Sequence, residues 1–218
     1  MSDRRSRLRF VTVGLMLVVA LLTIVPGAWA AGDEFFQAGT VTSANGVAGD
    51  FTGGSVAISA DGSTMVVGVP EANSGQEEVY VYTRGANGWQ TANEPAVVSA
   101  SDGAADDEFG YSVSVSQDGG VVAVGAPYAN AGGSHRGEVY VFNRPAGGWA
   151  PQSTQTETTS ATGPADYDQL GYAVALSPDG AYLAAGATGY SSSVPLTGQG
   201  GVYVWGYSAN RVSADSPR

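Results

Sequence analysis

The sequence predicts an all-β fold made of three repeats of one four-stranded antiparallel unit. Three stretches align without gaps: "FTGGSVAISADGSTMVVGVP" from Phe51, "EFGYSVSVSQDGGVVAVGAP" from Glu108 and "QLGYAVALSPDGAYLAAGAT" from Gln169. A second motif follows each stretch, as "EVYVY", "EVYVF" and "GVYVW". No part of the chain after residue 30 shows the apolar period of an amphipathic helix. An internal repeat of strands therefore defines the fold.

Each repeat contains four candidate strands, which we name A to D in chain order. Strand A is a short alternating run, Ser55–Ile58 in the first repeat, and alternation indicates a strand with one buried face. Strand B, such as Val121–Val124, is apolar throughout, as expected of a strand covered on both faces. Strand C alternates valine with aromatic residues, as in Val139–Phe142. We expect strand D to begin near Trp89 and Trp149, and the third repeat has no equivalent tryptophan and no clear strand D.

Glycines mark two positions in every repeat. An Asp-Gly pair separates strands A and B, and such a pair predicts a tight two-residue hairpin turn with positive φ; the pairs are Asp61-Gly62, Asp118-Gly119 and Asp179-Gly180. Another glycine lies near the end of strand B, where we expect positive φ or a close backbone approach; these are Gly68, Gly125 and Gly186.

Four antiparallel strands repeated about every 60 residues are typical of β-propeller blades, and a β-sandwich is the structural alternative. The segment before the first repeat, "FFQAGTVTSANGVAGDF", resembles the end of a repeat and predicts a latch strand at 31–49. Such an offset lets the first and last blades pair and covers exposed edges. Because propellers usually close with four to eight blades, three blades leave three arrangements open. They are a homodimer that completes a six-blade ring, an open arc, and an incomplete ring from a longer propeller.

The motifs of the second repeat resemble the FG-GAP repeat, the blade of integrin α-subunit propellers and of many secreted bacterial and archaeal proteins. They are Phe109-Gly110, Val124–Pro127, Val139–Phe142 and Trp149. The first and third repeats have Thr-Gly and Leu-Gly in place of Phe-Gly, and the resemblance covers residues 33–218. It implies a propeller with an adhesion or cell-surface role. Integrin-type blades often carry a calcium loop between strands A and B, but "SADG", "SQDG" and "SPDG" are too short to supply six oxygen ligands.

The first thirty residues predict a secretory signal peptide. Four arginines precede an apolar run at 10–25, and Ala28-Trp29-Ala30 fits a cleavage site. The run is shorter than the roughly 20 residues that a membrane span needs. We therefore expect cleavage after Ala30, no stable membrane span afterwards, and a secreted or cell-surface protein. An uncleaved anchor is the alternative, and the route, Sec or twin-arginine, stays open.

Charge and cysteine content exclude several function classes. The net charge is −11, and removal of residues 1–30 leaves five arginines against nineteen acids, a net charge of −14. A surface this acidic repels nucleic-acid phosphates, so we expect no nucleic-acid partner. The chain contains no cysteine, which excludes disulfides, thiol catalysis and thiolate metal sites.

The candidate site lies on the loops of one side. In each repeat the D–A and B–C connections share one side, and the B–C loops differ in length: 71–78, 128–138 and 189–201. Variation confined to one side of a repeat scaffold is typical of a binding surface. The candidate ligand-binding residues on this loop face are Asp102, Asp106, Asp107, Tyr128, Asn130, His135, Arg136, Asp166, Asp168 and Tyr190.

Each of these candidates also has a purely structural interpretation. Asp102, Asp106 and Asp107 are weak candidates for a calcium site, or they form a solvated charged loop. We expect no other cofactor. The two tyrosines either stack on sugar rings or a peptide, or pack within their loops. His135, the only histidine, is a base, a metal ligand or a surface residue. We expect Tyr111 and Tyr172 to pack between blades.

The sequence thus predicts a non-enzymatic, secreted binding module that recognises an extracellular protein or glycan. One alternative is a hydrolase or lyase acting on extracellular polysaccharide with loop carboxylates as acid and base; another is a structural fragment of a larger envelope protein. The expected organisation is a signal peptide (1–30), an N-terminal strand (31–49), blade 1 (50–105), blade 2 (106–165) and an incomplete blade 3 (166–218).

Overall fold

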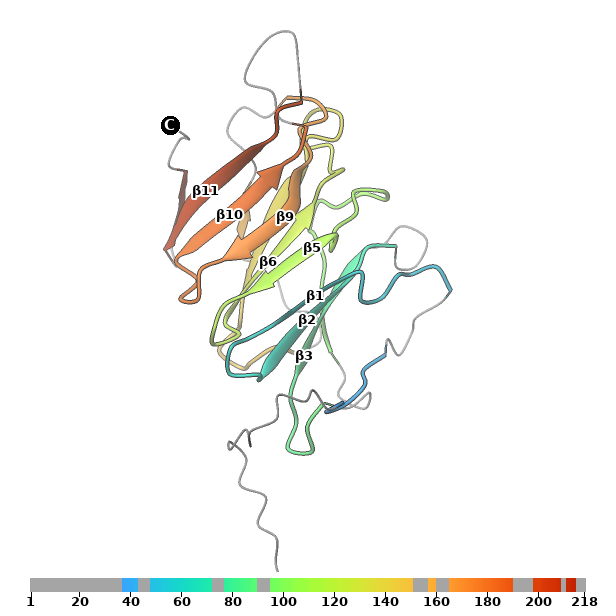
Figure 1. Cartoon of the computed structure of the whole chain (residues 1–218), viewed down its shortest axis with the longest axis vertical. Helices are drawn as coiled ribbons and strands as arrows, with labels where there is room; N and C mark the ends of the chain where they lie inside the picture. Colours follow the sequence, from blue (N-terminus) through green and yellow to red (C-terminus); the bar gives the residue numbers. More distant parts are fainter. Residues whose placement is uncertain are drawn as a thin grey trace, which may run out of the picture. The chain divides into compact units, whose positions relative to one another are not determined.

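The computed structural model describes residues 37–42, 48–71, 77–89, 95–150, 157–159, 165–189, 198–208 and 211–214. All of them belong to the unit Gln37–Arg218 and form three four-stranded antiparallel sheets (Figure 1). Blade 1 contains β1 (Ser55–Ile58), β2 (Thr64–Val69), β3 (Glu78–Thr83) and β4 (Ala96–Val98). Blade 2 contains β5 (Ser112–Val115), β6 (Val121–Ala126), β7 (Glu138–Asn143) and β8 (Glu157–Thr159). Blade 3 contains β9 (Leu170–Leu176), β10 (Tyr182–Ala187), β11 (Gly201–Ser208) and β12 (Arg211–Ala214).

The strands of each blade are hydrogen-bonded in chain order, A to D. The prediction of an all-β fold with three four-stranded antiparallel repeats is therefore confirmed. The described residues contain no helix. Within those residues, no helix is long and apolar enough to cross a bilayer.

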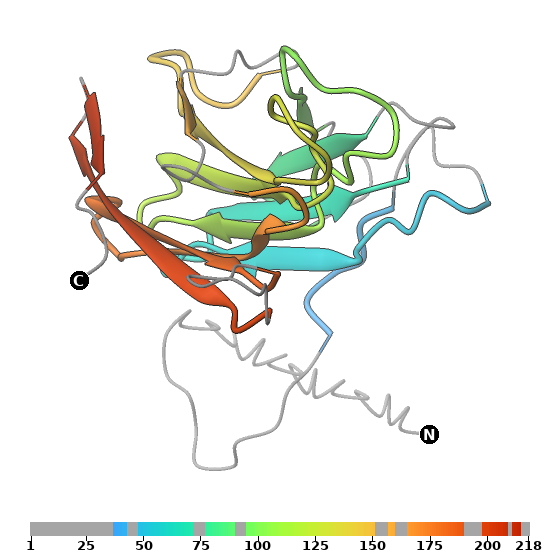
Figure 2. The same ribbon diagram turned by 90° about the horizontal axis from the view of Figure 1, so that it is seen from above.

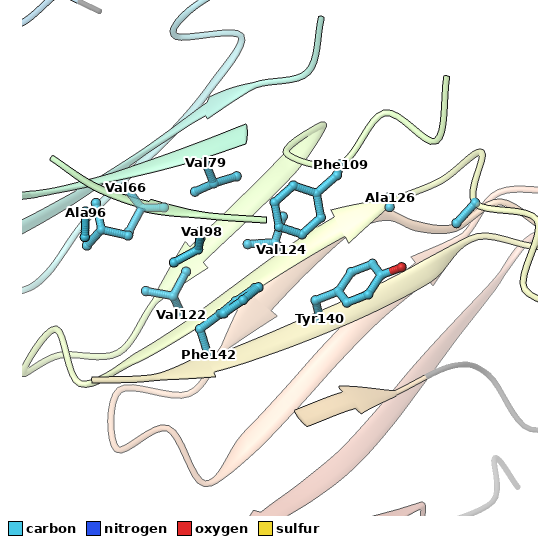
Figure 3. Close-up of a cluster of buried hydrophobic side chains, with 12 residues drawn as sticks. Val66, Val79, Ala96, Val98, Phe109, Val122, Val124, Ala126, Tyr140 and Phe142 are labelled. Atoms are coloured by element: carbon cyan, nitrogen blue, oxygen red, sulfur yellow. The ribbon is translucent and has the colours of Figure 1, made fainter. Parts of the chain in front are cut away.

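Two hydrophobic cores join the blades, which lie one beside the next in chain order (Figure 2). In the first core, the rings of Phe109, Tyr140 and Phe142 pack with β6 valines of blade 2 against valines of blade 1 (Figure 3). The Phe109 ring lies edge-on to both other rings, with centroids 5.4 Å and 6.0 Å away, a favourable arrangement of aromatic quadrupoles. The second core packs Ala123, with Val139 and Val141, against blade 3. Strand B of blade 2 is apolar on both faces because each face meets a different neighbour.

Glycine permits the close approach of consecutive blades. A Cβ at Gly125 would meet the carbonyl oxygen of Gly171 in blade 3, and Ser112 Oγ donates a hydrogen bond to that same oxygen (2.7 Å). The equivalent Gly68 lies against Gly110 in the same way. The predicted close approach is thus confirmed at Gly68 and Gly125, whereas at Gly186 the nearest atoms to a Cβ are 3.9 Å away.

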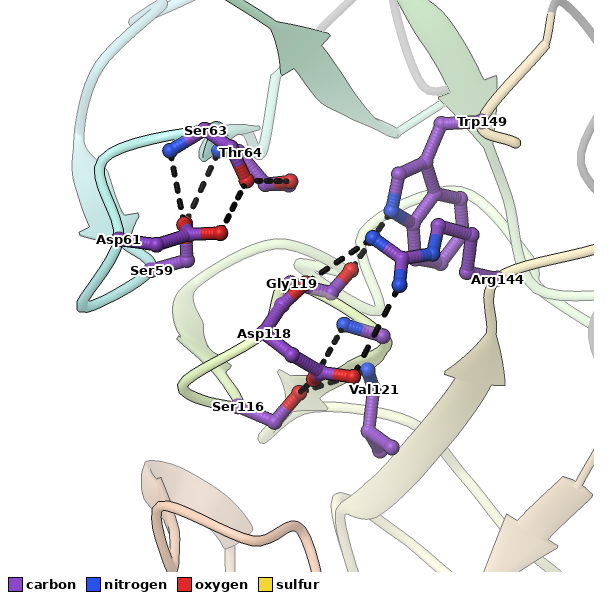
Figure 4. Close-up of polar contacts among 11 residues, drawn as sticks. Ser59, Asp61, Ser63, Thr64, Ser116, Asp118, Gly119, Val121, Arg144 and Trp149 are labelled. Carbon is purple, nitrogen blue, oxygen red and sulfur yellow. Dashed lines mark hydrogen bonds and ion pairs between the residues drawn. The ribbon is translucent and has the colours of Figure 1, made fainter.

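The A–B turns differ from the predicted two-residue hairpins (Figure 4). In blade 2, Ser116 N–H donates to Val121 O (2.9 Å) and Gly119 N–H donates to Ser116 O (3.0 Å), so four residues separate the paired ends. This is a four-residue loop built around a β-turn. Only the glycine of the Asp-Gly pair has positive φ, 67° at Gly119.

The aspartate closes the turn with a serine. Ser116 Oγ donates to Asp118 Oδ1 (2.8 Å) and accepts from the Val121 N–H (2.9 Å), while the carboxylate accepts from the Gly120 N–H (2.9 Å). The same serine–aspartate pair recurs in blades 1 and 3. These hydrogen bonds stabilise the charged carboxylate, so the pKa of Asp61 falls to about 2 and the pKa values of Asp118 and Asp179 are also lowered.

Strand D begins later than the tryptophans suggested, because Trp149 belongs to the C–D connection. Its indole N–H donates to Gly119 O (2.8 Å), and Arg144 Nη1 donates to Asp118 O (2.9 Å). The C–D connection therefore packs on the A–B turn, and β8 starts only at Glu157. This contact confirms that the A–B and C–D connections share one side of the blade.

Blade 3 does contain a strand D, contrary to the expectation from the sequence, but its register is shifted. Strands β4 and β8 pair with Val79–Val81 and Val139–Val141. The equivalent residues of β11 are Val202–Val204, whereas β12 pairs with Trp205–Ser208. Among the described strands, none pairs with Val202–Val204 on that edge.

The expected N-terminal strand is only partly within the described residues. Residues 37–42 enter none of the described sheets. Val41 packs against the core formed by Val67, Val69, Tyr80 and Tyr82. In the repeat alignment Val41 corresponds to Val98 of β4, which packs against blade 2. Val41 thus packs on blade 1 in the same way that Val98, in strand D of blade 1, packs on blade 2. The expected signal peptide at residues 1–30 lies outside the described residues.

Candidate functional site

A seam of backbone hydrogen bonds builds the loop face between blades 2 and 3. The N–H groups of Tyr167 and Gln169 donate to the carbonyls of Ser134 (2.8 Å) and His135 (3.1 Å). The Leu170 N–H donates to Arg136 O (2.9 Å). The D–A loop of blade 3 is therefore joined to the B–C loop of blade 2, as expected for connections that share one side.

Three rings gather on this seam. The His135 ring lies between Tyr128 and Tyr167, edge-on to each, with centroids 5.3 Å and 5.6 Å away. His135 is exposed, Tyr167 is 61% exposed and Tyr128 is half-buried, so two of the three rings of this Tyr–His–Tyr cluster are open to solvent. The sequence singled out Tyr128 and His135, but it missed Tyr167, which only the seam brings to the pair.

Polar side chains fix the loop below the rings. Arg136 Nε donates to Asp166 Oδ1 (3.3 Å), which also accepts from the Ser134 N–H (3.2 Å). Asn130 Oδ1 accepts from the His135 N–H (3.3 Å). His135 and Tyr167 both have positive φ, 47° and 66°, and these contacts hold that uncommon backbone conformation. Three predicted residues, Asn130, Arg136 and Asp166, thus support the rings.

Asp107 and Asp168 have a structural role. Both are buried, 5% and 2% exposed, and each closes its own D–A loop. Asp107 Oδ2 accepts from the Ala104 N–H (2.7 Å), and Asp168 Oδ2 accepts from the Ala165 N–H (2.5 Å). Burial raises the pKa of Asp107, against the lowering effect of the Ala104 hydrogen bond. We therefore assign these two carboxylates to the scaffold.

The acidic D–A loop of blade 2 does not assemble a metal site. Asp102 and Asp106 are exposed whereas Asp107 is buried. Among the residues that the structure describes, no group of three or more histidine, aspartate or glutamate side chains could hold a metal ion. Asp102 and Asp106 are therefore surface residues of the loop face. Tyr190 lies outside the described residues.

Glu77 is a second residue of this face, after Tyr167, that sequence reasoning missed. Its two carboxylate oxygens accept the N–H groups of Glu108 and Phe109 (2.6 Å each). At the next junction the equivalent N–H groups, of Gln169 and Leu170, donate to backbone carbonyls. One side chain in blade 1 thus replaces two carbonyls of blade 2. The signal in the sequence was a lone Glu-Glu before strand C, which reads as surface charge.

Burial controls the ionisation of Glu77. Desolvation raises the pKa of Glu77 to about 7, although the two N–H donors lower it. Together with Ala100, Ala104 and Phe109 it lines a pocket of about 220 Å³. The pKa values of Glu108 and Glu138 are also raised, first by burial and then by neighbouring carboxylates. The loop face of blades 1 and 2 is therefore acidic and partly buried.

The comparisons with known proteins agree with the fold. Residues 93–142 match the family model described as FG-GAP repeat, a range that contains strands β4 to β7 and most of blade 2. The chain therefore contains an FG-GAP repeat on a propeller-type, all-β scaffold. A search of curated proteins found no match.

Proposed function

We propose that this protein is a non-enzymatic binding module that recognises an extracellular protein or glycan through the Tyr–His–Tyr cluster of its loop face. The observation that carries the proposal is the exposure of His135 and Tyr167, beside the half-buried Tyr128, on a seam whose backbone is fixed by hydrogen bonds. Exposed aromatic rings on rigid loops supply contact area at a low cost in conformational entropy. The FG-GAP repeat and the unequal B–C loops support the same function.

The location of the protein is part of the proposal. A signal peptide at residues 1–30 would deliver the module to the cell surface or the medium, where an acidic, cysteine-free surface is compatible with an oxidising environment. The mass of the exported chain tests this step, because cleavage after Ala30 leaves Ala31 as the first residue.

Binding is tested with glycan and extracellular-protein arrays. His135→Asn and Tyr167→Asn remove the rings while keeping a residue type that tolerates positive φ, and Tyr128→Phe removes only a hydroxyl. We expect each asparagine variant to weaken binding at least tenfold. Gln117→Ala, on the side of the A–B turns, is the matched control and should bind normally. Binding that survives both asparagine substitutions would refute the assignment of the site.

A hydrolase acting on polysaccharide is the second candidate, and one observation favours it. The pKa of Glu77, about 7, is in the range of a general acid, and the residue lines a pocket. Both carboxylate oxygens are, however, engaged by backbone N–H groups, which leaves this side chain in a structural role. Turnover of an arrayed glycan that is lost in Glu77→Gln would overturn the non-enzymatic proposal.

A further inference from the structure

Two tyrosines meet across the junction of blades 2 and 3. Tyr111 directly precedes β5 and Tyr172 lies in β9, and the two positions are equivalent in the repeat alignment. Their ring centroids are 4.8 Å apart, with an angle of 52° between the ring planes. The expectation that Tyr111 and Tyr172 pack between blades is therefore confirmed, and each ring belongs to a different blade.

The hydroxyl groups of these two rings also lie together. A hydrogen bond with the Tyr172 side chain, and then burial, raises the pKa of Tyr111 to about 12. Two phenols in hydrogen-bond contact also bring their ortho carbons close, because the ortho carbons flank the carbon that carries the hydroxyl group. These are the carbons through which two tyrosyl radicals couple. The pair thus has the arrangement that a carbon–carbon bond between tyrosines requires.

The repeated contacts of a blade junction do not include this pair. Ser55 Oγ donates to Gly110 O (2.6 Å) at the first junction, and Ser112 Oγ donates to Gly171 O (2.7 Å) at the second. Blade 1, however, has Gly54 at the position of the two tyrosines. The first junction therefore forms without a tyrosine pair, and the pair is an additional feature of the second.

Solvent reaches the Tyr111–Tyr172 pair. Tyr172 is 38% exposed and Tyr111 is half-buried. By contrast, Tyr80 and Tyr82 of β3, whose rings are also in contact, are 6% and 1% exposed and lie edge-on with centroids 6.3 Å apart. A small oxidant can therefore reach the pair at the junction, whereas the hydrophobic core shields the pair on β3.

A covalent bond at this place would join two blades of a chain that has no disulfides. The chain contains no cysteine, so no disulfide can restrict its unfolded state. The two tyrosines are about 60 residues apart in the sequence. A crosslink between them closes a long loop in the unfolded chain, which is the condition under which a crosslink stabilises a fold most.

We propose that Tyr111 and Tyr172 are a site of oxidative modification, at which a dityrosine bond crosslinks blade 2 to blade 3 and stabilises their junction. The oxidant is hydrogen peroxide acting through a haem peroxidase. Each phenol loses one electron and its hydroxyl proton, and the two radicals join through one ortho carbon of each ring. Each ring then becomes aromatic again as its ortho hydrogen leaves as a proton and its oxygen regains one.

The electrons and atoms of this step balance. Two C–H bonds break and one C–C bond forms, and the two electrons and two protons released reduce one hydrogen peroxide to two waters. The protein therefore loses two hydrogen atoms. This inference goes beyond the proposed function, because neither tyrosine belongs to the Tyr–His–Tyr cluster and the bond forms whether or not the loop face binds a ligand.

Peptide mapping locates the bond. The purified protein is diluted to prevent coupling between molecules, treated with a haem peroxidase and one equivalent of hydrogen peroxide, and digested with trypsin. The chain has no lysine and trypsin does not cut the Arg144-Pro145 bond, so Tyr111 falls in peptide 85–136 and Tyr172 in peptide 137–211. We expect these two peptides to be linked, with dityrosine fluorescence and a mass two hydrogen atoms below their sum.

Phenylalanine variants assign the bond to its residues, because they keep the rings and remove the phenols. Tyr111→Phe and Tyr172→Phe should each abolish the link. Tyr128→Phe is the matched control, since Tyr128 is the other tyrosine of peptide 85–136, and it should be linked as the wild type is. A link that survives in Tyr111→Phe, or no link in the folded wild-type protein, would overturn the proposal.

The melting temperature tests the effect of the bond on the junction. We expect peroxidase treatment to raise the melting temperature of the wild-type protein by about 5 °C or more, because the bond restricts the unfolded chain. The same treatment should leave the melting temperature of Tyr111→Phe unchanged. A crosslinked protein that melts no higher than the untreated one would refute the stabilising role.

Discussion

At the scale of single residues, the D–A loops depend on acceptors for their N–H groups, and Glu77 supplies two of them. Its removal leaves the N–H groups of Glu108 and the buried Phe109 without those partners. We expect Glu77→Ala to reduce the free energy of unfolding by about 1–3 kcal/mol. Chemical denaturation measures this loss, and Glu78→Ala, one residue along, is the matched control. An equal loss in both variants would contradict the role of Glu77.

The raised pKa of Glu77 predicts in which direction the stability of the protein changes with pH. The folded-state pKa of about 7 lies above the ordinary 4.5, so the folded state binds the additional proton between these values. Stability should therefore decrease as pH rises from about 4.5 to about 7. Glu77→Gln removes the charge, and the difference in stability between wild type and this variant should change over that window. A difference that is flat with pH would show that the carboxyl titrates normally.

The aspartates of the A–B turns should change stability with pH in the direction opposite to Glu77. Hydrogen bonds from the Gly120 N–H and Ser116 lower the pKa of Asp118, so its stabilising contribution is present above the unfolded pKa and is lost as pH falls through the folded one. We expect Asp118→Ala to cost about 0.5–1 kcal/mol at pH 7, since the group is mostly exposed and screened. The cost should shrink in acid. Gln117→Ala, in the same loop, should have no effect at either pH.

At the scale of elements, the spacing between blades depends on one glycine in strand B. A Cβ at Gly125 would meet the backbone of Gly171, which cannot move without disturbing β9. We expect Gly125→Ala to reduce the free energy of unfolding by about 1–3 kcal/mol. Gly186→Ala, the same position in blade 3, should be tolerated in a single chain because its nearest neighbours are 3.9 Å away. Thermal melts of both variants measure the contrast, which disappears if intrinsic strand propensity decides instead.

At the scale of the whole molecule, the fold is a row of sheets in which blade 2 takes part in both inter-blade cores. In such arrays each unit contacts only its neighbours, so a substitution at one interface should destabilise the two blades that share it more than the third. We expect Phe109→Ala, at a cost of about 3–5 kcal/mol, to lower amide protection most in blades 1 and 2. Leu183→Ala should do so in blades 2 and 3. Hydrogen exchange with mass spectrometry reads out each blade, and uniform loss in both variants would contradict independent interfaces.

Local patterns in the sequence were sufficient to predict the blades. Alternation in strand A, the two-sided apolar character of strand B and the Val-aromatic strand C each reflect contacts that recur in every repeat. The length of the A–B loop was wrong because the pattern cannot show that Ser116 pairs with Val121. Strand D was misplaced for a related reason: the tryptophan before it is fixed by a hydrogen bond to a different turn.

The sequence by itself determined the all-β class, the number of repeats, the side on which the variable loops lie and two of the three rings of the aromatic cluster, because these follow from local periodicity and spacing. Only the tertiary structure decided which candidates meet. It placed Tyr167 beside His135, buried Asp107 and Asp168 in their own loops, and gave Glu77 the role of two carbonyls. Those outcomes depend on hydrogen bonds between residues about thirty positions apart or on burial, and no local pattern encodes either.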